Sequence, residues 1–191
     1  MSTFLELDCR DKWAPPLHQA VKANDKTLIL NLIEQGVDIN GCDCCGQTPL
    51  HWAAQYGLQD IIELLIQNGS FVNAIDKNGR TALYFSVKNN HIKSVHSLIL
   101  AKADVNGTNY NNESSLYIAS LYSRKEIIEI LLKANADVHF ISQVHEIIYH
   151  AVARNQNEGC VSLFLNKGMN INERRDNGWT PLHDAVWQSN K

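Results

Sequence analysis

The stretch that decides the fold is Gly46-Gln47-Thr48-Pro49-Leu50-His51-Trp52-Ala53-Ala54, because it returns at a fixed interval. Thr48 and Thr81 are 33 residues apart, and residues 79–87 read Gly-Arg-Thr-Ala-Leu-Tyr-Phe-Ser-Val. The same step leads onward to Ser114-Ser115-Leu116-Tyr117, Ile147-Ile148-Tyr149-His150 and Thr180-Pro181-Leu182-His183, and backward to Pro15-Pro16-Leu17-His18. The sequence therefore describes an array of short repeats.

A second landmark keeps the same step. An Ile or Val precedes each of Asn40, Asn73, Asn106, His139 and Asn172. No insertion disturbs the register between these positions. Chance agreement at both landmarks is remote, so nearly the whole chain belongs to the array.

With a Thr-Pro-Leu-His signature and a period of 33 residues, the chain resembles the ankyrin-repeat family from about residue 10 onward. The resemblance implies an all-α fold, a solenoid of stacked helix–turn–helix repeats with β-hairpin-like finger loops. Each repeat then touches only its neighbours, within a single elongated domain. We expect an N-terminal flank, about five full repeats and a partial sixth, with the boundaries 1–9, 10–42, 43–75, 76–108, 109–141, 142–174 and 175–191.

Turn chemistry and apolar spacing predict the elements inside a repeat. We expect helices over residues 15–23, 26–35, 48–56 and 59–68, the third of them ending at Gly57. Gly46 should take a positive φ at the tip of its finger. Asn112 holds that place in the fourth repeat, which is acceptable because Asn enters the left-handed region readily. His145 holds it in the fifth, so the fifth finger is the least predictable.

The sixth repeat reaches Lys191 after only one of its two helices. A lone terminal helix leaves apolar surface uncovered, because the end of an array needs a shield. We therefore expect the protein to continue beyond Lys191.

Composition limits the classes of partner and compartment. The chain has 191 residues, a net charge of −3 and a hydrophobic fraction of 45%, which indicate a folded protein with no general attraction to nucleic acid or anionic lipid. No apolar run approaches the roughly 18 residues of a membrane span, and the amino terminus does not read as a signal peptide. We expect a cytoplasmic protein, with the nucleus as the alternative, and no direct membrane insertion.

Cysteine and histidine residues are the natural candidates for metal binding and catalysis. Cys42, Cys44 and Cys45 crowd one finger, where they could share a soft ion, but no second ligand pair at zinc spacing accompanies them, and we favour reduced thiols. The repeat histidines are expected to tie each repeat to the next through hydrogen bonds; they are His18, His51, His150 and His183. No nucleophile or phosphate-binding motif is present. We expect no catalytic residue, no cofactor and no metal.

The resemblance also implies where a partner binds. In the family, the fingers and first helices line a concave groove that grips a protein partner. The matching places in this chain hold Gln47, Gln55, Tyr56, Lys77, Asn78, Arg80, Lys88, Asn89, Tyr110, Asn111, Glu113, Leu121, Tyr122, Arg154, Asn177 and Trp179. The aromatic members are candidate anchors, although each is equally able to pack against its own repeat. Trp52 and Phe85 are expected in the core.

These observations predict a non-enzymatic protein–protein interaction module, a monomeric array that binds one or more proteins. Two alternatives stay open. The chain could be the substrate-recognition part of a larger adaptor, for example a ubiquitin-ligase adaptor with a C-terminal box. It could equally be the docking segment of a larger enzyme or channel.

Overall fold

A computed structural model describes residues 14–139, 148–154, 158–168, 170–175 and 177–189. The contacts within the chain group into two compact units, residues 1–103 and 104–191. The division between Ala103 and Asp104 falls near the end of the third expected repeat. The boundaries of the individual repeats stay a prediction.

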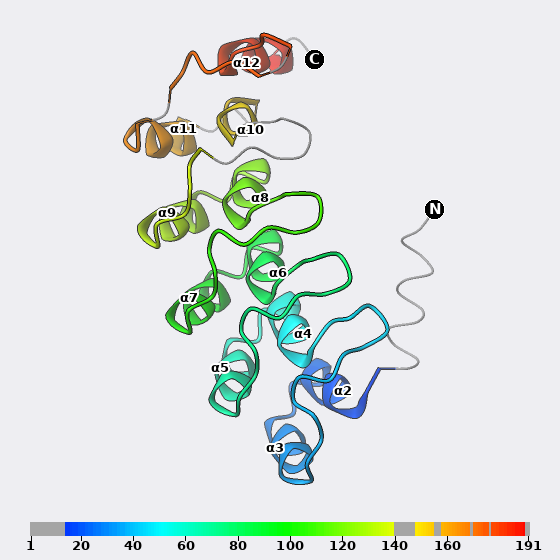
Figure 1. The fold of residues 1–191 in the computed structure, drawn as a ribbon. Coiled ribbons are helices and arrows are strands. Elements are labelled where there is room, and N and C mark those ends of the chain that lie inside the picture. The colour runs from blue at the N-terminus through cyan, green and yellow to red at the C-terminus, as the bar shows by residue number, and fades with distance from the viewer. Residues whose placement is uncertain (1–13, 140–147, 155–157, 169, 176, 190–191) are drawn as a thin grey trace. The chain divides into compact units, whose positions relative to one another are not determined.

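The described residues of the first unit, 14–103, contain three helix pairs. They are α2 (Pro16–Lys22) with α3 (Lys26–Glu34), α4 (Pro49–Tyr56) with α5 (Gln59–Gln67), and α6 (Ala82–Lys88) with α7 (Ile92–Leu100). The first helices α2, α4 and α6 pack side by side, and α5 packs beside α7 in a second row (Figure 1). The four helices predicted here are confirmed to within one residue at each end.

The second unit repeats this arrangement. It contains α8 (Ser115–Leu121), α9 (Lys125–Lys133), α10 (Ile148–Arg154), α11 (Glu158–Leu165) and α12 (Pro181–Ser189). Helix α10 packs against both α8 and α12, and α9 packs beside α11 (Figure 1). The described residues contain no strand, only an isolated antiparallel bridge between Thr108 and Ser114 in a finger. The all-α repeat fold is confirmed.

The first helices of the second, third and fourth repeats begin at a hydroxyl side chain. The Thr81 and Ser114 side chains accept hydrogen bonds from the backbone N–H groups of Tyr84 and Tyr117, three residues further on. In the second repeat, Thr48 and His51 cap the start of α4 together. These bonds satisfy N–H groups that the helix itself cannot pair. The recurring Thr or Ser is therefore the start signal of the repeat.

The tip of each described finger bends through a residue with positive φ. Gly46, Gly79 and Gly178 have φ values of 77°, 75° and 78°, and Asn112 substitutes for them with a φ of 52°. The predictions for Gly46 and Asn112 are confirmed. The fifth finger, with His145, lies outside the described residues.

The apolar core follows the register of the repeat. Leu17, Leu50, Leu83 and Leu116 occupy one position in four successive repeats, and all are buried. Trp52 and Phe85 are also buried, as predicted, and their rings make edge contacts with His18 and His51 of the preceding repeat at 5.3 and 5.9 Å. Within the ranges given above, no helix is both long and apolar enough to cross a bilayer.

Candidate partner-binding surface

Three of the repeat histidines link their own first helix to the following finger. The imidazole Nε2 atoms of His18, His51 and His150 lie 2.8, 3.0 and 2.9 Å from the carbonyl oxygens of Gln47, Arg80 and Trp179. Each of these contacts joins residues 29 apart, so every bond crosses from one repeat to the next. The predicted structural role of these three histidines is confirmed.

The surroundings of His51 define its protonation state. The Thr48 amide N–H donates to Nδ1 at 3.0 Å, so Nδ1 accepts, and Nε2–H donates to the Arg80 carbonyl. A second proton on Nδ1 would meet the Thr48 amide hydrogen. Burial lowers the pKa of His51, and the Arg80 carbonyl and nearby carboxylates offset this only in part. Burial likewise lowers the pKa of His18. Both rings are thus uncharged at neutral pH and serve as structural hydrogen-bonding groups.

A carboxylate at the base of the second and third fingers fixes each loop. Asp76 Oδ1 accepts from the backbone N–H groups of Asn78 and Arg80 at 2.8 and 2.9 Å. Asp43 Oδ1 does the same for Cys45 and Gln47, both at 2.8 Å, and its Oδ2 accepts from the Trp52 indole N–H at 2.9 Å. The fingers of the second and third repeats are therefore built before any partner arrives, which reduces the entropy lost on binding.

Adjacent fingers in the first unit are also joined to each other. The Lys77 amide N–H and its ammonium donate to the carbonyl oxygens of Cys45 and Cys44, at 3.1 and 2.8 Å. Lys77 is exposed, so it takes part in this contact while its side chain remains on the surface. The two fingers form one continuous surface.

The described cysteines of this surface form no disulfide. Cys42 and Cys44 are exposed, and the Sγ atoms of Cys44 and Cys45 are 3.9 Å apart. Across the part of the chain that the structure describes, no group of three or more His, Cys, Asp or Glu side chains is arranged to hold a metal ion. Cys9 lies outside the described residues.

Tyr56 is the aromatic side chain that this surface presents in the second repeat. It closes helix α4, is 41% exposed, and rests one edge against the buried Trp52 at 6.2 Å between ring centroids. Beside it, the Gln55 carbonyl accepts from Asn89 Nδ2 and from His91 Nε2 at 3.2 and 3.0 Å. The Tyr56 ring thus packs against its own repeat on one edge and remains partly exposed to solvent, which suits an interface anchor.

Two expected contact residues of the first unit are used by the fold itself. Gln47 is fully buried, and its amide nitrogen donates to Asp76 of the next repeat at 3.4 Å. Arg80 is half-buried, pairs with Asp76 at 2.7 Å and lies over the Phe85 ring at 4.9 Å. Gln47 therefore presents no side chain to a partner. The Arg80 charge is largely neutralised: burial would raise the pKa of Asp76, but the bonds from Arg80 and the Asn78 amide outweigh it and lower the pKa.

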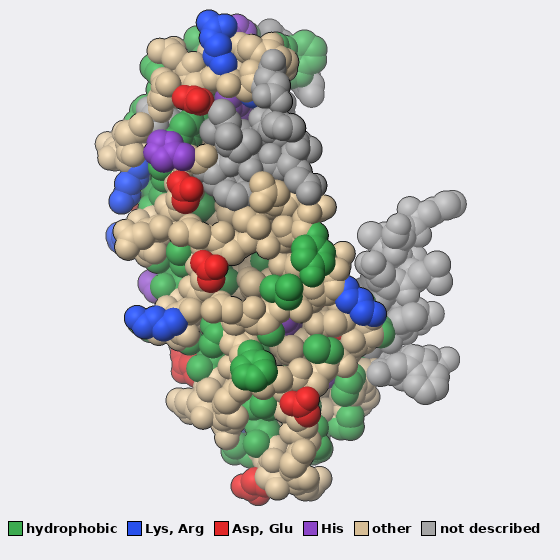
Figure 2. All heavy atoms as spheres, viewed as in Figure 1, with side chains coloured by type: hydrophobic (Ala, Val, Ile, Leu, Met, Phe, Trp, Pro, Cys, Tyr) green, Lys and Arg blue, Asp and Glu red, His purple; other side chains and the backbone are tan. Residues whose placement is uncertain are grey.

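The remaining expected residues of the first unit lie at the surface. Lys88 is half-buried with its ammonium 5.9 Å from the Tyr84 ring centroid, and Asn78 and Asn89 are exposed. On the face shown in Figure 2, charged side chains are scattered singly rather than gathered into a basic track. That distribution offers hydrogen bonds and isolated charges rather than one strong field.

The second unit presents its own set of aromatic residues. Tyr110 is 63% exposed at the fourth finger, and Tyr122, which caps α8, is 46% exposed with the Arg124 guanidinium 5.9 Å from its ring centroid. Asn111 is exposed and Leu121 is half-buried. Glu113 is half-buried because its carboxylate accepts from Asn109 Nδ2 at 2.6 Å.

In the sixth finger, Asn177 and Trp179 contact each other, and the Trp179 ring contacts neighbouring side chains. The exposed Asn177 accepts from the Trp179 amide N–H at 3.0 Å. The half-buried Trp179 ring lies 5.2 Å from the Arg175 guanidinium and 5.8 Å from the Trp187 ring. Arg154 ends helix α10, but its side chain lies outside the described residues.

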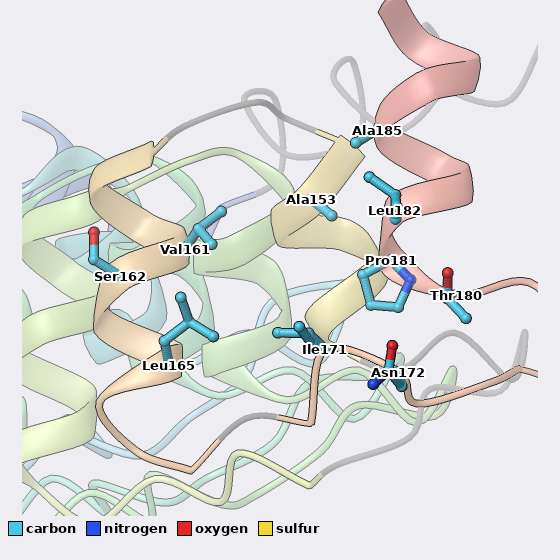
Figure 3. Close-up of a pocket in the computed structure, with 10 residues that line it drawn as sticks. All are labelled: Ala153, Val161, Ser162, Leu165, Ile171, Asn172, Thr180, Pro181, Leu182 and Ala185. Atoms are coloured by element: carbon cyan, nitrogen blue, oxygen red, sulfur yellow. The ribbon is translucent and has the colours of Figure 1, made fainter.

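A further surface is apolar, and the sequence indicated its existence without identifying its residues. Val161 and Leu165 on α11, Ile171 in the following loop and Leu182 on α12 line a groove of about 560 Å³ (Figure 3). The register of the repeat could have identified these lining residues, because the equivalent positions of earlier repeats are more deeply buried.

The comparison with known families agrees with the repeat geometry. A family model described as ankyrin repeats in three copies matches residues 17–109, 75–142 and 116–191. The chain therefore belongs to the ankyrin-repeat family. Such repeats are generally protein–protein interaction modules and are typically non-catalytic. No curated protein matches this chain.

Proposed function

We propose that this chain is a non-enzymatic module that binds a protein partner through its fingers and the carboxyl ends of its first helices. One observation carries the proposal. Tyr56 and Tyr122 occupy the same register position two repeats apart, and both rings are exposed. An exposed tyrosine that is backed by its own repeat supplies large apolar area with few rotamers to freeze, as interface anchors do.

The surroundings of the two tyrosines define the kind of partner. Near Tyr56, Asn89 Nδ2 donates to the Gln55 carbonyl, and Lys88 precedes Asn89 at the end of α6. Such an arrangement favours a protein segment with one apolar side chain among hydrogen-bonding groups. It does not favour nucleic acid, for which an extended basic track would be needed. We propose one or more protein partners, no nucleic acid and no membrane insertion.

We also propose that the chain acts as a monomer in the cytoplasm, or in the nucleus as the second choice. The exposed Cys42 and Cys44 thiols support this placement, because both compartments keep thiols reduced. The non-enzymatic assignment is supported by the structural use of His51, whose ring accepts from the Thr48 amide and donates to the Arg80 carbonyl.

The test is affinity capture from a lysate of the source organism with the wild-type chain and three variants. Tyr56→Ala and Tyr122→Ala each remove one proposed anchor, in different compact units. Phe71→Ala is the matched control, since Phe71 is an exposed aromatic residue outside the fingers and first helices. Circular dichroism confirms that each variant is folded.

We expect a partner that is retained by the wild type and by Phe71→Ala and is depleted about tenfold or more by at least one tyrosine variant. A partner held equally by all four proteins would overturn the proposed surface. Loss with Phe71→Ala alone would move the site to the loops that follow the second helices.

A further inference from the structure

The tip of the second finger carries two thiols side by side. The Gly46 amide N–H donates to the Asp43 carbonyl at 3.0 Å, which closes a β-turn whose central residues are Cys44 and Cys45. The Sγ atoms of these two residues lie 3.9 Å apart. Successive side chains of an extended strand point to opposite faces, so it is the turn that brings the two sulfur atoms together. We call this pair the turn dithiol.

The fold fixes the backbone of the turn dithiol from two directions. Within the finger, Asp43 Oδ1 accepts from the amide N–H groups of Cys45 and Gln47, both at 2.8 Å. From the next repeat, the amide N–H and the ammonium of Lys77 donate to the carbonyl oxygens of Cys45 and Cys44, at 3.1 and 2.8 Å. These bonds use backbone atoms of the pair, so they hold the turn without using its sulfur atoms.

The turn dithiol stands at the most accessible place of its finger. The central turn residues of the third and fourth fingers are all exposed, namely Lys77, Asn78, Tyr110 and Asn111. In the same place, Cys44 is exposed and Cys45 is half-buried. A dissolved reagent can therefore reach both sulfur atoms, whereas Cys160 in the second unit is buried.

The separation of the sulfur atoms fits one bridging atom better than a direct bond. Two metal–sulfur bonds of about 2.3 Å at a tetrahedral angle place their sulfur atoms about 3.8 Å apart. The observed 3.9 Å is close to that value. A disulfide would need an S–S distance of about 2.05 Å and favours Cα atoms about 4.4–6.8 Å apart, more than the roughly 3.8 Å between adjacent residues. The turn dithiol is therefore arranged to chelate a single atom.

The number of available ligands selects the class of that atom. Zinc sites generally take three or four protein ligands, and a linear two-coordinate ion would separate its two sulfur ligands by twice the bond length. In the part of the chain that the structure describes, no three His, Cys, Asp or Glu side chains are arranged to hold a metal ion. Trivalent arsenic forms three bonds, so two sulfur atoms and one further substituent complete it. Thiolate sulfur is a soft ligand and suits such a soft centre.

We propose that the turn dithiol is a binding site for trivalent arsenic in the form of its oxyacid, arsenous acid. The sulfur atoms of Cys44 and Cys45 each form one bond to arsenic, and two As–OH bonds break. The two thiol protons leave with the released hydroxides as two molecules of water. Arsenic keeps its oxidation state, so the step needs no oxidant or reductant. The prebuilt turn reduces the entropy lost on chelation.

The probe is phenylarsine oxide, in which a phenyl group blocks the third bond of the arsenic. Added to the full 191-residue chain, it should attach one phenylarsenic unit with loss of one molecule of water, which intact mass spectrometry measures. The complex is then challenged with the monothiol glutathione. Arsenic held by one sulfur atom is released readily, whereas chelated arsenic is retained because its second bond forms within the chain.

Three variants assign the ligands. Cys44→Ser and Cys45→Ser each remove one sulfur atom of the pair, and Cys42→Ser is the matched control because Cys42 is an exposed cysteine of the same finger outside the pair. Serine is tolerated in turns, and circular dichroism verifies that each variant is folded. A peptide of residues 40–50 that carries Cys42→Ser has the same two thiols without the repeats that hold the turn.

We expect the wild type and Cys42→Ser to retain one equivalent of arsenic, and Cys44→Ser and Cys45→Ser to release it at a glutathione concentration about a hundredfold lower. The peptide should release it at a concentration about tenfold lower than the folded chain does, because its turn is not prebuilt. Arsenite should compete with the probe for the wild-type chain.

Equal retention by the wild type, Cys44→Ser and Cys45→Ser would overturn the proposal, and so would loss of retention in Cys42→Ser. Equal retention by the peptide and the folded chain would show that the fold does not build the site. Failure of arsenite to displace the probe would exclude arsenous acid as the ligand.

Discussion

Leu182 occupies in the sixth repeat the position that Leu50 occupies in the second, yet Leu182 is 69% exposed and Leu50 only 1%. The two residues share their chemistry, their register and the second position of a first helix. They differ in what lies over them. Leu50 is covered by its own second helix and the adjoining repeats, whereas Leu182 borders the apolar groove.

The pair allows a direct test of the core. Leu50→Ala should reduce the free energy of unfolding by about 2–5 kcal/mol, because it leaves a cavity in a packed array. Leu182→Ala should change it by less than about 0.5 kcal/mol, as exposed substitutions do. Urea unfolding followed by circular dichroism measures both. Equal losses for the two variants would contradict the placement of Leu50 in the core and Leu182 at the surface.

Gly57 supports a second prediction, because its backbone has a φ of 71° and a Cβ there would lie 2.5 Å from Nδ1 of His91. Gly36 has a φ of 81° and open space where a Cβ would stand, so it isolates the backbone effect. We expect Gly36→Ala to cost about 1 kcal/mol through backbone strain. Gly57→Ala should cost about 1 kcal/mol more, because the displaced imidazole loses its bond to Gln55.

The two glycine variants are compared by their urea midpoints at one pH. A larger loss for Gly36→Ala than for Gly57→Ala would show that the contact between Gly57 and His91 does not constrain the junction of these repeats.

Local chemistry made most of the fold predictable from the sequence. Gly46, Gly57 and Asn112 act through φ values set within a few residues, and each behaves as expected. Gln47 was less predictable. Its place in the repeat suggested a surface residue, but its amide reaches Asp76 in the next repeat, 29 residues away. That contact requires an acceptor at position 76, and the place of Gln47 in its own repeat does not predict it.

The candidate surface shows the same division. Exposure of Tyr56 and Tyr122 follows from their position at the end of a first helix, which the period defines. The pairing of Arg80 with Asp76 and its position over Phe85 require three side chains to be placed together. Periodicity predicts which face a residue occupies, but not whether the fold already uses its charge.

The neutral histidines predict a decline of stability in mild acid. Burial lowers the pKa of His18 and His51 below their usual value of about 6.5, so below that pH the unfolded chain binds more protons than the folded one. The stability that the two uncharged histidines contribute is fully present above about pH 6.5. It is lost as the pH falls through their lowered pKa values in the folded state. Unfolding midpoints measured between about pH 7.5 and pH 5 should therefore decrease.

His51→Gln should be less stable at neutral pH but should show a shallower dependence on pH, since one of the two groups no longer titrates. His183→Gln is the matched control, because His183 is exposed in the equivalent place of the sixth repeat. It should keep the wild-type slope. An unchanged slope in His51→Gln would remove His51 as a source of the acid sensitivity.

The sixth repeat carries a different pair at two positions that Asp43 and Trp52 fill in the second. In the second repeat, Asp43 accepts from the Trp52 indole N–H at 2.9 Å. In the sixth repeat, Arg175 donates to the buried Asp184 at 2.8 Å. His150 stands where His18 packs against Trp52, so the surroundings also correspond. The carboxylate–indole pair should therefore be transferable to the sixth repeat.

Arg175→Asp alone places two carboxylates together, and Asp184→Trp alone removes the partner of Arg175, so each should destabilise the chain by on the order of 3 kcal/mol. The double variant Arg175→Asp/Asp184→Trp should recover more than half of the summed loss, because the introduced carboxylate and indole can form the bond seen between Asp43 and Trp52. A double-mutant cycle from urea unfolding measures this coupling. Additive losses would show that the two repeats place these positions differently, despite their common register.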